Sequence, residues 1–144
     1  MKFLYSFLIS AMIIVGFSGC GNISTVKDGT LELDKSLTVG KAFDNYKYFK
    51  SVKWSEITTE NGKKVVQVDG VVDFDKHPKG AEWKNALKEA KMIFQFTVNE
   101  DKSFQITYFG MEGIKTDGEK IEHNANQFQM GLNLKQIYNN EPIS

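Results

Sequence analysis

Two periods of hydrophobic residues run through this chain, and each predicts one kind of element. A period near 3.6 residues, typical of an amphipathic helix, begins behind Thr38, which is a favoured N-cap residue. The apolar positions of this first helix are Val39, Ala42, Phe43 and Tyr46. The period returns after a loop at residues 76–80, and it predicts a second helix with apolar positions at Trp83, Ala86, Leu87 and Ala90.

A period of two residues predicts strands that are wet on one face. The first hairpin joins residues 52–59 to residues 64–74 through Asn61-Gly62, a strong signal for a tight turn. On the return strand the inward residues are Val66, Val68, Val72 and Phe74, and the outward ones are Gln67, Asp69 and Asp73. A second hairpin joins residues 92–98 to residues 104–108, and Asp117-Gly118 marks a further turn.

The apolar residues of the C-terminal part are compatible with both the helical period and the strand period. Residues 128–134 alternate as in a strand, whereas Leu134, Ile137 and Tyr138 have helical spacing behind Asn133 as an N-cap. We predict a short helix at about residues 134–139, followed by a polar tail around Pro142 that frays. Together the elements predict an α+β domain at residues 31–144, with a single antiparallel sheet of about four strands and helices packed on one face. The aromatic residues expected in its core are Phe43, Phe74, Phe94, Phe96 and Phe104.

The first twenty residues have a different pattern. Lys2 precedes an apolar run at residues 3–15, and small residues then lead to Cys20, the only cysteine. This order of charged, apolar and small segments is typical of a secretory leader. The segment Phe17-Ser18-Gly19-Cys20 resembles the lipobox of bacterial lipoproteins. The resemblance implies that residues 1–19 are a signal peptide, that Cys20 becomes an acylated N-terminus carrying palmitate-like chains, and that residues 20–30 are a short tether to the membrane.

The same resemblance implies a place in the bacterial cell envelope. Gly21, rather than aspartate, follows the cysteine, which favours the outer membrane in a host with two membranes. Cleavage before Cys20 would leave 125 residues, enough for one domain with a modest core. A single cysteine in an exported chain excludes an internal disulfide, so the core must stabilise itself.

The charged residues of the chain exclude some classes of binding partner. The chain has 18 lysines, no arginine and 18 acidic residues, with a net charge of zero. No basic stripe is present, so we expect no nucleic-acid partner. Arginine is the preferred side chain for bidentate capture of phosphate or carboxylate, and its absence disfavours a specific anion clamp.

Catalytic patterns are weak, and we expect neither an enzyme nor a cofactor. Asp73, Asp75 and His77 alternate and form a weak candidate set for a divalent cation, which a metal-assisted hydrolase would need. Solvated carboxylates and a loop histidine explain the same residues. His123 has no second histidine at a ligand spacing, and no Gly-x-Ser-x-Gly motif is present.

A group of aromatic residues after the first predicted helix is a candidate protein interface, although the same residues could also pack in the core. Its members are Tyr46, Tyr48, Phe49 and Trp54. The leading hypothesis is therefore a noncatalytic envelope lipoprotein that binds another envelope protein, as an assembly accessory, inhibitor or exclusion factor. The alternative is a lipoprotein that carries a small lipid or glycan fragment in an apolar cleft between helices and sheet.

Overall fold

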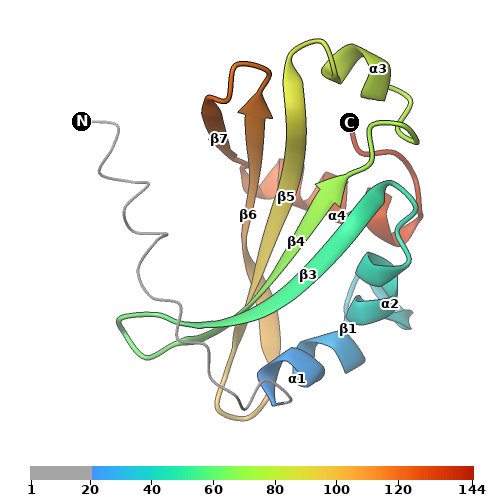
Figure 1. Cartoon of the computed structure of the whole chain (residues 1–144). Coiled ribbons are helices and arrows are strands. Elements are labelled where there is room, and N and C mark those ends of the chain that lie inside the picture. The colour runs from blue at the N-terminus through green and yellow to red at the C-terminus, as the bar shows by residue number, and fades with distance from the viewer. Residues whose placement is uncertain (1–20) are drawn as a thin grey trace.

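The computed structural model describes residues 21–144 and shows an α+β fold built on a long, twisted antiparallel sheet (Figure 1). Five strands follow one another as a meander: β3 (Phe49–Thr58), β4 (Lys64–Val72), β5 (Leu87–Val98), β6 (Phe104–Lys115) and β7 (Lys120–Asn124). A separate two-stranded sheet pairs β1 (Thr30–Leu31) with β2 (Asp34–Thr38). The helices are α1 (Asn22–Asp28), α2 (Val39–Asp44), α3 (Gly80–Trp83) and α4 (Gln127–Tyr138).

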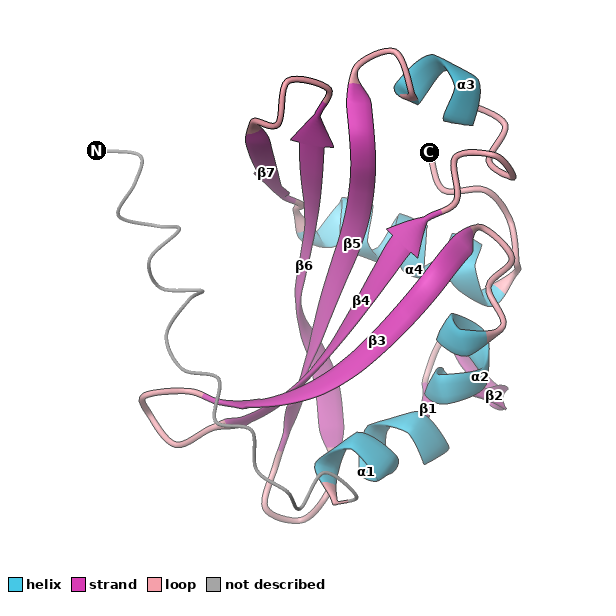
Figure 2. Ribbon diagram, in the orientation of Figure 1, coloured by secondary structure: helices cyan, strands magenta, loops and turns pink. Residues whose placement is uncertain are grey.

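Helices cover one face of the sheet and leave the other open. In Figure 2 α4 lies behind the strands, α2 lies to the right of β3, α1 lies at one end of the sheet and α3 at the other. The core forms between α2, α4 and the inward residues of the strands. At its centre the Phe43 ring lies 5.0 Å from that of Phe94 and 6.2 Å from that of Phe96, and all three side chains are fully buried. Phe74 and Phe104 are partly buried against this cluster.

The prediction of an α+β fold with an antiparallel sheet is therefore confirmed, and the turn chemistry explains its register. Gly62 has φ +78° in the first hairpin and Gly118 has φ +93° before β7, a backbone region that glycine adopts without strain. Thr38 caps α2 as predicted, since its side chain accepts a hydrogen bond from the Lys41 N–H at 3.3 Å.

The predicted second helix is wrong beyond its first turn. Only Gly80–Trp83 is helical, and β5 begins at Leu87. Ala90 pairs with Gly113 of β6, and Lys91 pairs with Val71 of β4 and with Glu112 of β6. The long strand β6 gives residues 87–91 backbone partners, and those bonds outweigh the helix propensity of the alanine, leucine and lysine residues in this segment.

Three further segments differ from the sequence expectation. The last helix begins at Gln127, seven residues earlier than predicted, because Asn126 and Gln129 form a capping box there. The expected fraying of the tail is also wrong, since Ile143 is 4% exposed. Finally, residues 22–28 form α1 with Val26 fully buried, so most of the expected tether is part of the folded domain.

The open face of the sheet carries the hydrogen-bonded polar residues that the alternation predicted. Gln95 donates to Gln67 and Gln67 donates to Asp69, each over 2.8 Å. The hydroxyl groups of Thr97 and Thr107 lie 2.9 Å apart. These side chains satisfy one another across the strands, so the face is a solvated, ordered surface.

Candidate functional site

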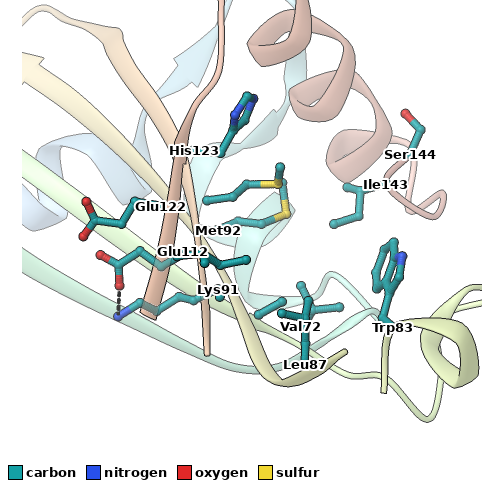
Figure 3. A pocket seen from close by; sticks show the side chains of 14 residues that line it. Val72, Trp83, Leu87, Lys91, Met92, Glu112, Glu122, His123, Ile143 and Ser144 are labelled. Atoms are coloured by element: carbon teal, nitrogen blue, oxygen red, sulfur yellow. Dashed lines mark ion pairs between the residues drawn. The ribbon is translucent and has the colours of Figure 1, made fainter. Parts of the chain in front are cut away.

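An apolar cleft of about 290 Å³ lies at the end of the sheet that is opposite α1. Its floor is the inward face of β5, β6 and β7, and α3 and the C-terminal segment form its walls (Figure 3). The apolar lining residues are Val72, Trp83, Leu87, Ala90, Met92, Met111, Gly113, Ile121 and Ile143. Met111 and Ile121 are 38% and 42% exposed, which is high for apolar residues in contact with a core.

Strand alternation explains why this cleft is apolar although charged residues lie on the same strands. Met92 points inward, whereas its neighbour Lys91 points to the open face and lies 3.4 Å from Glu112. Figure 3 shows these two charged side chains, with Glu122, on the side of the strands away from Met92 and Ile143. The cleft stays uncovered because α4 packs farther along the sheet and none of its residues lines it.

The C-terminal wall of the cleft is held by two side chains from elsewhere in the chain. The Tyr46 hydroxyl donates to the Glu141 carbonyl at 2.6 Å and accepts from the Ile143 N–H at 3.1 Å. The His77 Nε2 lies 2.9 Å from the Ile143 carbonyl oxygen. Because Ile143 lines the cleft, these bonds hold one of its walls in place.

The environment of His77 sets its protonation state. A carbonyl oxygen only accepts, so Nε2 carries the hydrogen, and Nδ1 accepts from the Lys79 N–H at 3.1 Å. The ring also stacks on Trp83 with centroids 4.2 Å apart. Burial lowers the pKa of His77 below 6.5, the hydrogen bond to Ile143 opposes this shift, and the charge of Lys79 adds to it. The neutral imidazole ring of His77 is therefore the form that bonds to Ile143 in the C-terminal segment.

This lowered pKa predicts a loss of stability in acid. Below about pH 6.5 the unfolded chain binds a proton at His77 while the folded chain resists it, so the free energy of unfolding falls as the pH falls. Urea unfolding at pH 7.5 and pH 5.0 should show this loss. His77→Gln keeps a donor for the Ile143 carbonyl and has no titrating ring, so the variant should lose less stability between these two pH values. An equal loss in both proteins would contradict the prediction.

The predicted aromatic interface is corrected by burial. Tyr46, Tyr48 and Phe49 are 3%, 9% and 8% exposed and belong to the core cluster. Trp54 is partly buried beside Phe43, and its indole N–H donates to Asp44 at 2.8 Å. Tyr46, Tyr48 and Phe49 therefore offer almost no surface to a partner, whereas Trp54 keeps part of its surface exposed.

The weak metal set does not converge. His77 is 5% exposed and uses both ring nitrogens within the protein, as described above. Asp73 accepts the backbone N–H of Asp75 at 3.0 Å, and Asp75 forms an ion pair with Lys84 that lowers the pKa of its carboxyl group. Within residues 21–144, no three His, Cys, Asp or Glu side chains are grouped so that they could hold a metal ion.

Cys20 lies outside the described residues, so its lipidation stays a prediction. In the described part of the chain, no helix has the length and apolar character to cross a membrane.

Sequence reasoning offered an apolar cleft only as an alternative, named no residue that lines it, and missed the strand at its edge. The signal for β7 was the Asp117-Gly118 turn followed by a single apolar residue, Ile121, between Lys120 and Glu122. One apolar residue is too short a pattern to predict a strand. Comparison of the chain with protein-family models, with curated proteins and with solved structures finds no match in any of the three.

Proposed function

We propose that this protein is a noncatalytic, lipid-anchored protein of the bacterial envelope that binds another envelope protein through the apolar cleft. The observation that carries the proposal is the pair Met111 and Ile121, which are 38% and 42% exposed and both line the cleft on one face of the sheet. Exposed, contiguous apolar surface on a folded domain is typical of an interaction site. Such a site also explains why the chain keeps an apolar pocket open to water.

Helix α1, the first described element after Cys20, and the cleft lie at opposite ends of the sheet. The Asn22 amide donates to Glu56 of β3 at 2.8 Å and accepts from Lys102 in the β5–β6 turn at 3.3 Å, so α1 starts at this end of the sheet. The 12 residues of β5 span about 36 Å, at about 3.3 Å per residue, from this end to the cleft. A lipid at Cys20, which precedes Gly21, would therefore present the cleft away from its own bilayer.

We expect Ile121→Lys to weaken binding of the partner at least tenfold and to change the unfolding free energy by less than about 1 kcal/mol, because Ile121 is 42% exposed. Leu33→Lys is a matched control, since Leu33 is 44% exposed and does not line the cleft. Crosslinking of the full-length protein in envelopes, followed by quantitative mass spectrometry, compares the two variants. Equal recovery of the partner with both would contradict the proposal.

A second function is favoured by the volume and lining of the same cleft. About 290 Å³ lies at the lower end of the roughly 300–1,000 Å³ typical of small-ligand sites. A lipid or glycan fragment with one short apolar group would fit this volume better than a diacyl lipid would. Mass spectrometry of solvent extracts from the purified protein tests this alternative, and a bound amphiphile at about one molecule per chain would favour it over a protein partner.

A further inference from the structure

Strand β7 is the outer edge of the sheet and borders the cleft directly. All five of its residues are exposed, and among residues 21–144 only β6 pairs with it. An edge strand presents a row of unpaired N–H and C=O groups that a strand of another chain can use. At the other edge of the sheet, Trp54 of β3 packs against Phe43 of α2.

The register shows which backbone groups of β7 are free. The Lys115 N–H bonds to the Glu119 carbonyl, and the Ala125 N–H bonds to the Phe109 carbonyl. In an antiparallel ladder every second residue bonds to the same neighbour, so Ile121 and His123 point their backbone groups at β6. The backbone groups of Lys120, Glu122 and Asn124 therefore point outward.

The side chains around this edge favour a positive charge on an incoming strand. On the open face, Lys120 lies 3.5 Å from both Glu112 and Glu122, and Lys91 lies 3.4 Å from Glu112 and 3.9 Å from Asp69. Within residues 21–144, Glu122 forms an ion pair only with Lys120, and Lys120 also pairs with Glu112, so Glu122 can accept a further positive charge. On the inward face Ile121 leads into the cleft.

We infer that an extended segment of a different protein adds to the sheet as a sixth strand beside β7, with one apolar side chain in the cleft and a basic residue opposite Glu122. This inference rests on the proposed function and specifies how the partner binds. The backbone groups of Lys120, Glu122 and Asn124 supply the affinity that is independent of sequence, and the cleft supplies the preference for an apolar residue.

Anchor geometry disfavours a second copy of this chain as the occupant. Antiparallel pairing of two β7 strands would place the two α1 ends at opposite ends of the joined sheet. With both anchors in one bilayer, the joined sheet would have to lie flat along the membrane, and neither cleft would be directed away from it.

The test places a photo-crosslinking amino acid at position 123 of the full-length protein in the envelope, with position 33 as the control site. Glu122→Pro removes an outward N–H and leaves the β6–β7 bonds in place, since proline is tolerated at an edge whose N–H faces solvent. We expect at least a tenfold loss of the crosslinked product. Glu122→Gln keeps that N–H and removes the charge, so its loss should be smaller, about two- to fivefold.

Lys120→Pro is a second variant, at the first residue of the strand, where proline is tolerated. Amide exchange at Ile121 and His123 verifies that β7 stays paired in the proline variants. A product that both proline variants leave unchanged would overturn strand addition while the proposed function stands. A product with twice the mass of the chain would overturn the assignment to a different protein. A crosslinker can also be placed at position 121, in the cleft. The absence of any protein product from both positions, 123 and 121, would overturn the proposed function itself.

Discussion

Gly80→Ala is expected to lower the free energy of unfolding by about 3 kcal/mol or more, the upper range for overpacking a filled site. A Cβ at Gly80 would lie 1.6 Å from the Phe74 carbonyl oxygen and 2.4 Å from its carbon, both of which are backbone atoms. The clash cannot be relieved by a side-chain rotation. The loop would have to shift, and with it His77, which bonds to Gly80 through its own carbonyl at 2.9 Å.

Gly131→Ala is the matched control for this substitution. Gly131 lies inside α4 and a Cβ there meets nothing within 4 Å, so alanine should stabilise the protein by roughly 0.5–1 kcal/mol. Urea unfolding followed by circular dichroism measures both variants against the parent. A Gly80→Ala protein as stable as the parent would mean that the backbone of residues 74–80 follows another path.

Cys20→Ser is expected to release the protein from membranes almost completely. Each buried methylene of an acyl chain contributes about 0.8 kcal/mol to membrane binding, and two or more chains make the anchor effectively permanent. The variant has no thiol to acylate, so labelled palmitate should not enter it and it should fractionate away from membranes. Ser10→Ala, within the apolar run, should leave both properties unchanged.

The intact mass of the native protein gives an independent measurement for this prediction. Acylation and cleavage before Cys20 would give a chain of 125 residues with the added mass of its acyl groups. A bare thiol at Cys20, or retention of residues 1–19, would contradict it. Neither outcome would alter the fold, because α1 and the sheet are made by residues after Gly21.

Much of the fold could be predicted because its signals are local. Asn61-Gly62 and Asp117-Gly118 place glycine where the turns need a positive φ, and alternation in β4 and β5 separates buried from solvated residues. The helix at Thr38 follows from a cap and an apolar stripe, both within nine residues of sequence. The strand at residues 87–91 could not be predicted, because its partners Val71 and residues 112–115 are remote in the chain.

The candidate site was the least predictable part, and the reason is spatial. Residues that looked free in the sequence, such as Tyr46 and His77, are used to hold the tail. The cleft collects Val72, Trp83, Met111, Ile121 and Ile143 from five separate segments, none of which has an unusual pattern by itself. Strand β7 is an edge strand because, among the described residues, no second strand pairs with its outer side, and a local sequence pattern does not show this.

The amino-acid order by itself determined the leader-like start, the two hairpins, the helix behind Thr38 and the two faces of the sheet, since caps, turns and alternation act between residues close in the chain. Tertiary structure decided that residues 87–91 extend a strand, that the aromatic group after α2 is core, and that an open cleft lies beside β7. Those outcomes depend on which distant segments pair and on where helices α2 and α4 stop covering the sheet.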